Sequence, residues 1–288
     1  MHYNKMALKK EVLIVNRGWS VTLRVACGLL LLAWAALSVP PGAIANGNFG
    51  SGDMTSWTTL GTATAVGAQG NVVPTSGNIY QAEIASGKDS TSVTCGALTG
   101  GTNNFTDVTV AALNSALNLP ATAFASALPA SYSSSPPTCG SAIYQTFTAF
   151  AGSAVSFDWA FATDEKNPTT HDAAFYTLLQ PGASQAQAVE LADTEDATFQ
   201  NGTAGSPLGS VTGYSHVSIT LPTTGTYTIG FVALQTYDDS AASATYISNV
   251  MGGAPLPVTP VPVTWSLALL GLGVIAIFSA VRRLVRAN

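Results

Sequence analysis

Acidic and amide side chains crowd into one short stretch of the chain. Asp164, Glu165 and Asn167 lie close together, and Asp172 follows five residues after Asn167. Carboxylate and amide oxygens gathered on a loop are the ligands that Ca²⁺ takes in proteins. The stretch lacks the ligand spacing of an EF-hand loop, and a solvated acidic loop is the alternative interpretation. The cofactor prediction is accordingly none, with Ca²⁺ as the one candidate ion.

The chain offers few residues for catalysis. A glycosidase needs two carboxylates about 5–10 Å apart, but with fourteen acids after residue 11 some such pair is inevitable. His171 and His216 are the histidines of the central region, and neither belongs to a zinc-binding or nucleophile-elbow motif. Ser215 and His216 are neighbours on a predicted strand, so their side chains face opposite ways. We predict a non-enzymatic protein, with a secreted glycoside hydrolase as the weakest alternative.

Two cysteines, Cys95 and Cys139, lie beyond residue 45. In an oxidising compartment an even number of cysteines predicts a disulfide between them. The bond would close a long loop and stabilise the fold by about 4 kcal/mol in the chain-entropy interpretation. Cys27 stands at the start of the N-terminal apolar run, which is the wrong place for a lipid-accepting cysteine.

Tyrosines are candidates for stacking on sugar rings, because their rings are large and apolar and carry a polar tip. Core packing is the alternative explanation for aromatic residues at strand spacing. A glycan-binding module therefore remains a second functional hypothesis. The candidates are Tyr80, Tyr132, Tyr144, Tyr214 and Tyr237.

The elements that must position these side chains are mainly strands. Residues 155–161, 217–221 and 227–233 alternate apolar and polar side chains, which predicts strands with one buried face. The Pro-Thr-Thr-Gly sequence at 222–225 is predicted to join the last two as a hairpin turn. Many short strands separated by Gly and Pro predict a β-sandwich, most simply a jelly roll. Further strands are expected at 46–49, 78–84, 173–179 and 245–250.

One stretch has helical character. Residues 107–128 are rich in Ala and Leu, Asp107 stands where an N-cap is expected, and Pro120 should divide the stretch into two short helices. The fold prediction is therefore a mainly β sandwich over residues 46–253 with a short helical insertion at about 107–128.

The N-terminus has the order of a secretory signal peptide. Five Lys and Arg residues precede an apolar run over residues 25–37, and two prolines follow it. Ala43 and Ala45 then supply the small-x-small pattern that signal peptidase accepts, so cleavage is predicted before Asn46. Residues 1–45 are accordingly assigned to a signal peptide with a signal helix, and the protein is predicted to be exported.

A second apolar run covers residues 265–281 and carries no charge. At about 1.5 Å rise per residue, a helix of this length is near the short limit for crossing ~30 Å of hydrocarbon. Arg282, Arg283 and Arg286 follow directly, and positive charge beside a span stays on the cytoplasmic side, while Trp265 suits the outer interface. We predict one transmembrane helix, with residues 282–288 in the cytoplasm and everything before Trp265 outside.

Residues 254–264 join the central region to this span. Four prolines among these eleven residues make an extended linker without internal hydrogen bonds. The order of proline patch, short span and arginines resembles the sorting tail of PEP-CTERM proteins, which exosortases process in exopolysaccharide-producing bacteria. The resemblance implies a processing protease as a partner. That family usually has Glu-Pro where Val263-Thr264 follow Pro262 here, which leaves a variant class of tail or a plain anchor as the alternatives.

Several shorter motifs resemble the jelly-roll domains of carbohydrate-binding modules and of PEP-CTERM surface proteins. In such domains an acid just after the first Phe and an Asp in the last strand often hold a structural Ca²⁺, but Gly50 and Ser248 occupy those positions here. The resemblance implies a location and a fold without a known activity. Its motifs are Asn46-Gly47-Asn48-Phe49 with Trp57, 140–147, 157–165, 172–175 and 225–231.

Charge narrows the range of partners. The exported region has two lysines, Lys88 and Lys166, against fourteen acids, which gives a net charge of −12. Such a surface repels nucleic acid and anionic polymers, and it suits cations, basic partners or neutral glycans, with solubility as the plainer explanation. We predict a cell-surface or extracellular-matrix protein associated with exopolysaccharide or biofilm. Before processing it would be anchored in the inner membrane and face the periplasm. A glycan-binding module is the alternative.

Overall fold

The computed structural model describes residues 44–87, 106–130, 136–165, 172–196, 198–203, 208–236 and 241–252. The predicted signal peptide up to Ala43, the linker at 254–264, the span at 265–281 and its arginines lie outside these ranges, so they stay predictions. Within the described part of the chain, no helix is long and apolar enough to cross a membrane.

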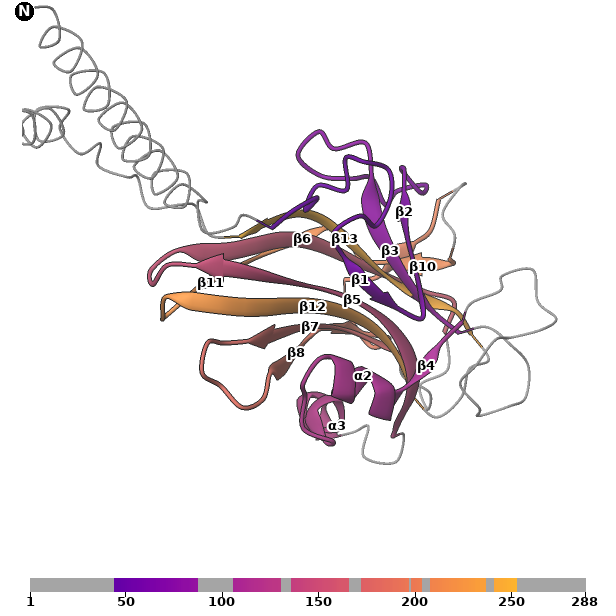
Figure 1. Ribbon diagram of the computed structural model, residues 1–288. Helices are drawn as coiled ribbons and strands as arrows, with labels where there is room; N and C mark the ends of the chain where they lie inside the picture. Colours follow the sequence, from indigo (N-terminus) through magenta and orange to yellow (C-terminus); the bar gives the residue numbers. More distant parts are fainter. Residues whose placement is uncertain are drawn as a thin grey trace, which may run out of the picture. The chain divides into compact units, whose positions relative to one another are not determined.

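Two antiparallel sheets pack face to face around one core (Figure 1). Sheet A has the strand order β1–β5–β12–β7–β8, and β4 also pairs with β5. The long central strands β5 and β12 are in register from Gly225 opposite Ala149 to Gln235 opposite Cys139. The strands of sheet A are β1 (Thr58–Leu60), β4 (Val108–Thr109), β5 (Pro137–Ala149), β7 (Ala173–Leu179), β8 (Gln187–Asp193) and β12 (Gly225–Thr236).

Sheet B has the strand order β2–β3–β13–β6–β10–β9, and β11 also pairs with β6. From β5 onward the chain passes repeatedly from one sheet to the other, as it does in a jelly roll. The predicted β-sandwich is therefore confirmed. The strands of sheet B are β2 (Thr62–Val66), β3 (Gln81–Ser86), β6 (Ala154–Thr163), β9 (Gln200–Asn201), β10 (Ser210–Val211), β11 (Ser215–Thr220) and β13 (Ser243–Gly252).

Aromatic rings from both sheets fill the space between them. Phe157 of β6 meets Phe231 of β12 edge to face, with ring centroids 4.7 Å apart. Trp57 lies 6.0 Å from Phe231 and stacks on Phe49 at 5.6 Å. Residues 46–49 form a turn and not the predicted strand, because Asn46 and Phe49 take positive φ angles and this backbone brings Phe49 into the core.

Two short helices cover the outer face of sheet A, as predicted from the break at Pro120 (Figure 1). They are α2 (Val110–Ala116) and α3 (Ala123–Ala127). The N-cap prediction is wrong, because Thr109 caps α2 by accepting a hydrogen bond from the Ala112 N–H at 3.2 Å. Asp107 is buried instead, and its carboxylate accepts hydrogen bonds from the Gly87 N–H and the Ser141 hydroxyl.

The predicted hairpin at 222–225 is also wrong. β11 pairs with β6 in sheet B, whereas β12 pairs with β5 and β7 in sheet A, so this turn carries the chain across the sandwich. Leu221 is fully buried just before the turn. The Tyr227 hydroxyl closes the turn by donating to the Thr223 carbonyl at 2.6 Å. Both strands bury one face in the same core, and strand alternation alone does not separate paired strands from facing ones.

Candidate functional site

A carboxylate and an imidazole meet on the outer face of sheet B. Asp158 of β6 and His216 of β11 are register partners, and their neighbours Phe157 and Val217 point into the core. Alternation along each strand therefore turns Asp158 and His216 outward. The Nδ1 atom of His216 lies 2.6 Å from Oδ1 of Asp158, and the His216 side chain is 55% exposed. The pair joins an open imidazole to a largely covered carboxylate.

Two further groups hold the second oxygen of Asp158. The Thr75 hydroxyl donates to Oδ2 from the loop between β2 and β3, and the Asn249 side-chain amide donates to it at 3.2 Å. Asn249 can reach because β13 has an irregular register after Ser248 and Asn249 takes a φ of +54°. Burial alone would raise the pKa of Asp158, but the donors Thr75, His216 and Asn249 together lower this pKa below its ordinary value. Asp158 is therefore an anion at neutral pH.

Small side chains extend the outer face beside this pair. Ser156 of β6 pairs with Ser218 of β11 on one side and with Met251 of β13 on the other. Ser218 is exposed and Met251 is 54% exposed. We call Ser156, Asp158, His216, Ser218 and Met251 the open flank of sheet B.

Another part of the same face is covered. Val72, from the loop between β2 and β3, packs with Ala85, Ala160 and Tyr246 in an apolar cluster. Thr75 of the same loop is also held by β13, because its backbone N–H donates a hydrogen bond to the Ser248 hydroxyl at 3.2 Å. The loop thus borders the open flank through Thr75.

Two tyrosines make a hydrogen-bonded layer under this cover. The Tyr246 hydroxyl donates to Glu83 at 2.7 Å, and the Tyr214 hydroxyl donates to the Gln81 side-chain oxygen. Burial raises the pKa of Glu83, although the Tyr246 hydroxyl opposes the shift. Burial also raises the pKa values of Tyr214 and Tyr246, and the charge of Asp158 adds to the shift of Tyr214. The two tyrosines are therefore uncharged hydrogen-bonding partners at neutral pH.

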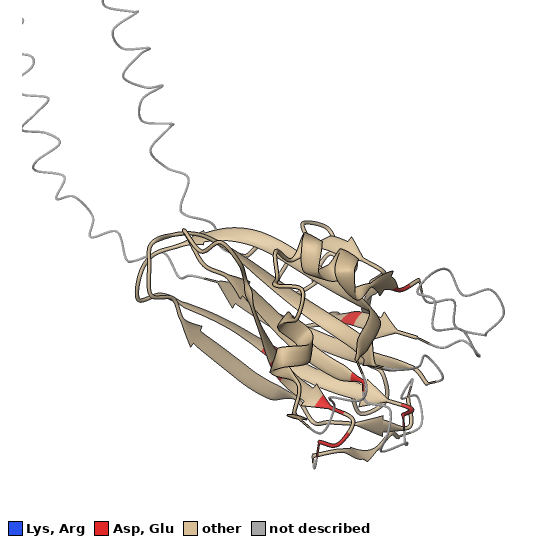
Figure 2. Cartoon of the chain, turned by 90° about the horizontal axis from the view of Figure 1, so that it is seen from below, with Lys and Arg blue, Asp and Glu red and all other residues tan. Residues whose placement is uncertain are grey.

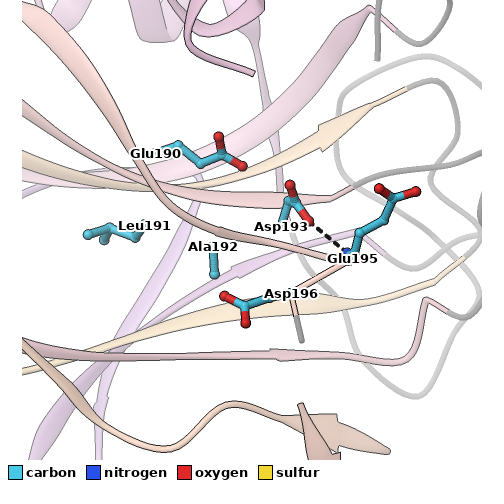
Figure 3. Close-up of a pocket in the computed structure, with 6 residues that line it drawn as sticks. All are labelled: Glu190, Leu191, Ala192, Asp193, Glu195 and Asp196. Atoms are coloured by element: carbon cyan, nitrogen blue, oxygen red, sulfur yellow. Dashed lines mark hydrogen bonds between the residues drawn. The ribbon is translucent and has the colours of Figure 1, made fainter. Parts of the chain in front are cut away.

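A separate acidic hollow of about 420 Å³ lies at the end of β8 (Figure 3). Glu190 and Asp193 project side by side, and Asp193 accepts a hydrogen bond from the Glu195 N–H at 2.7 Å. Burial, the hydrogen bond with Asp193 and the charges of Asp193 and Asp196 raise the pKa of Glu190 to about 8. Burial and repulsion between neighbouring carboxylates explain the raised pKa of Glu190 without any ligand.

The predicted calcium ligands that the structure describes bind different partners. Asp164 accepts a hydrogen bond from the Gly209 N–H at 2.7 Å, whereas buried Asp172 accepts one from the Ser243 hydroxyl. Glu165 is buried, and Asn167 lies outside the described residues. Among the described residues, no three His, Cys, Asp or Glu side chains gather closely enough to hold a metal ion. Calcium binding at the full predicted set stays a prediction.

Other predicted site residues fall partly outside the described ranges. Cys139 is buried and disulfide-bonded, but Cys95 lies outside, so the pairing of these two stays a prediction. Ala45 and Asn46 are described, and the Gln145 side chain exchanges hydrogen bonds with the Ala45 backbone. The described members of the tyrosine set, Tyr80, Tyr144 and Tyr214, are each partly buried. None of them presents a fully open ring.

Sequence reasoning missed the Asp158–His216 pair. It treated His216 only with its chain neighbour Ser215, because the partner of a strand is not written in the strand. One signal was available, since Asp158 and His216 are ionisable residues at outward positions of two alternating strands. Their meeting depends on the register of β6 with β11.

No protein-family model matches the chain, and no curated protein sequence matches it. Among solved structures it is similar to the carbohydrate-binding module TmCBM61 in complex with β-1,4-galactotriose, at 12% identity and a TM-score of 0.37, over 72% of this chain and 94% of that one. It is similar to CBM27-1 of Caldicellulosiruptor saccharolyticus in complex with mannohexaose, at 11% identity and a TM-score of 0.36, over 75% and 98%.

A third similar structure is the K1 cleaved adhesin domain of Lys-gingipain from Porphyromonas gingivalis W83, at 14% identity and a TM-score of 0.34, over 69% of this chain and 94% of that one. These identities and TM-scores describe a loose similarity between β-sandwiches. No residue role is carried over from these proteins to this chain.

Proposed function

We propose that the β-sandwich is a glycan-binding module whose ligand lies on the open flank of sheet B. The observation that carries the proposal is the Asp158–His216 pair, fixed by Thr75 and Asn249 and left open on the imidazole side. Polar side chains held in advance by neighbours lose little entropy when they bind a sugar hydroxyl. Met251 adds an exposed apolar surface beside them, against which the CH faces of a sugar can pack.

The covered and open parts of the molecule support this location. α2 and α3 occupy the outer face of sheet A, and the loop containing Val72 occupies part of sheet B. The open flank is a sheet face whose small side chains Ser156 and Ser218 leave room for an extended chain of sugars. A flat and shallow polar surface of this kind suits a polymer better than a small metabolite, which needs an enclosing pocket.

The test is calorimetric titration of the full-length protein, kept soluble in a neutral detergent, with neutral oligosaccharides of several linkages. Binding of at least one oligosaccharide is expected, and His216→Ala should weaken it at least tenfold. The matched control is Thr58→Ala, an exposed threonine on β1 of the other sheet. Binding that survives His216→Ala unchanged would move the site elsewhere, and no binding to any glycan would overturn the function.

A hydrolytic function has one observation in its favour. Asp158 and Glu83 lie on the same sheet face, and their surroundings shift their pKa values in opposite directions, as in many acid–base pairs. However, Glu83 is held by buried Tyr246, and Nε2 of His216 has no hydroxyl partner among the described residues. We therefore propose a module without a catalytic step. Release of reducing sugar from any bound oligosaccharide would contradict this.

The proposed location of the module rests on the two ends of the chain. The signal-like N-terminus and the apolar run at 265–281 with its three arginines support an exported module attached by its C-terminus to the inner membrane. The proline-rich linker and the resemblance to PEP-CTERM tails support later processing by a protease and transfer to the cell surface or the extracellular polymer. A glycan-binding module at that location would attach to exopolysaccharide.

A further inference from the structure

The described part of the chain carries acidic side chains and no lysine or arginine (Figure 2). Of the fourteen acids beyond residue 11, Asp89, Asp238 and Asp239 lie outside the described ranges, which leaves eleven inside them. Lys88 and Lys166 also lie outside these ranges. The field around such a domain raises the local concentration of cations and lowers that of anions.

The Asp158–His216 pair adds a specific hydrogen-bonding site to this general electrostatic attraction. In the neutral imidazole, a carboxylate 2.6 Å from Nδ1 holds the ring proton on Nδ1, since an ionised carboxylate only accepts hydrogen bonds. The lone pair of Nε2 then faces the solvent, where the side chain is 55% exposed. The open end of the pair is therefore a hydrogen-bond acceptor with a negative charge behind it.

An acceptor of this kind discriminates among glycans by their substituents. A sugar hydroxyl can donate to Nε2, and an ammonium group can donate while also gaining from the charge of Asp158. A uronate, sulfate or phosphate group offers no donor and is repelled by the same charge. The attraction between the ammonium group and the Asp158 carboxylate is stronger at low ionic strength, because salt screens charges at an exposed site over about 10 Å.

We propose that the open flank selects polysaccharides that carry free amino groups, with an ammonium group donating a hydrogen bond to Nε2 of His216. This inference rests on the proposed glycan-binding function and names the ligand class of the same site. The ligand is a polymer of amino sugars that are at least partly without N-acetyl groups. A polymer of this class is cationic, which matches the acidic domain, and it offers both hydroxyl and ammonium donors along its length.

The test compares three oligosaccharides of equal length on the full-length protein in neutral detergent at neutral pH and low ionic strength. They are a β-1,4-linked glucosamine oligomer, its fully N-acetylated counterpart and a uronate oligomer. We expect the glucosamine oligomer to bind about tenfold more tightly than the N-acetylated one, and the uronate oligomer to bind least. Adding 0.5 M NaCl should remove most of the preference.

Two variants separate the local contact from the general field. His216→Gln changes an exposed side chain and leaves Asp158 in place, and Asp158→Asn removes the charge behind the imidazole. Each should abolish the preference for the amino oligomer. Glu195→Gln is the matched control, because it removes one negative charge from an exposed position beyond β8 in the other sheet.

The outcomes distinguish this inference from the function beneath it. Equal binding of the amino and N-acetylated oligomers overturns the ligand class and leaves glycan binding in place. A preference that falls equally in Glu195→Gln and Asp158→Asn, each of which removes one negative charge, assigns the attraction to total charge and overturns the contact with His216. Absence of binding to all three oligomers, and to the neutral oligosaccharides, overturns the proposed function itself.

Discussion

Asp158 and Glu190 are carboxylates on neighbouring layers of the same sandwich, yet their surroundings shift their pKa values in opposite directions. Three hydrogen-bond donors face Asp158 and favour its charged form, so they outweigh the effect of burial. Burial raises the pKa of Glu190, and the neighbouring acids Asp193 and Asp196 at the end of β8 raise it further. The number of donors around each oxygen therefore decides which carboxylate is an anion.

The raised pKa of Glu190 predicts a loss of stability with rising pH. Between about pH 4.5 and pH 8 the folded protein keeps the proton that the unfolded chain has lost, so the free energy of unfolding falls as pH rises through this window. Glu190 is partly exposed and solvent screens the effect, so the contribution is on the order of 1 kcal/mol. Glu190→Gln should flatten the decline, as measured by urea unfolding at pH 5 and pH 8. If the free energy of unfolding falls equally between pH 5 and pH 8 in both proteins, Glu190 is not the cause of the decline.

At the residue scale, the sequence shows which chemical groups are present but not which of them are neighbours in space. The acidic stretch at Asp164 was visible from residue types alone, but the structure gives Asp164 and Asp172 separate partners. The Asp158–His216 pair joins residues 58 positions apart through strand register. Residue types name the groups that can react or bind, and only the pairing of strands brings two of them within 3 Å.

The two short helices depend on sheet A for their stability. A helix of five or seven residues is far too short to form alone in water. Phe124 of α3 is 1% exposed and meets Phe175 of β7 edge to face, with ring centroids 5.1 Å apart. This contact anchors α3 over the sheet.

Phe124→Ala should therefore lower the free energy of unfolding by about 3–4 kcal/mol, because it removes a buried ring and leaves a cavity that the short helix cannot fill. Phe124→Leu is the matched control and should cost less than half as much, since it keeps most of the apolar volume. Chemical denaturation followed by tryptophan fluorescence measures both variants. A loss below 1 kcal/mol for the alanine variant would mean that α3 contributes little to folding.

At the element scale, periodicity predicted strands better than it predicted their connections. β7 was predicted with its observed bounds, and the break at Pro120 gave two helices as expected. The turn after Leu221 was assigned to a hairpin, although it crosses between sheets. Asp107 has the residue type of an N-cap, but tertiary hydrogen bonds to Gly87 and Ser141 bind it instead. The local preference of a residue for a cap or turn is therefore overridden where buried tertiary hydrogen bonds stabilise another conformation.

Over the whole molecule, the disulfide of Cys139 is the one covalent link expected between distant parts of the exported region. If its partner is Cys95, Cys95→Ser and Cys139→Ser should each lower the free energy of unfolding by about 4 kcal/mol, and the double variant should cost no more than either. Additive losses would contradict the pairing. Peptide masses with and without a reducing agent provide an independent check of which cysteines are linked.

Opposite charges divide the chain along its length. Eight of its ten Lys and Arg residues lie before residue 25 or after residue 281, while the region between them has a net charge of −12. Positive charge is retained on the cytoplasmic side of a membrane, and an acidic region crosses with little hindrance. This distribution predicts that the two ends act during export and attachment, and that the mature module is the acidic part.

Intact-mass measurement of the native protein, after separation of membrane and extracellular fractions, tests this division. The membrane form should begin at Asn46 and end at Asn288, and the extracellular form should begin at Asn46 and lack residues 265–288, with its end near Pro262. A form beginning at Met1 would contradict signal cleavage. If every molecule ends at Asn288 and stays with the membrane, the tail is an anchor, and attachment to exopolysaccharide must occur at the cell membrane.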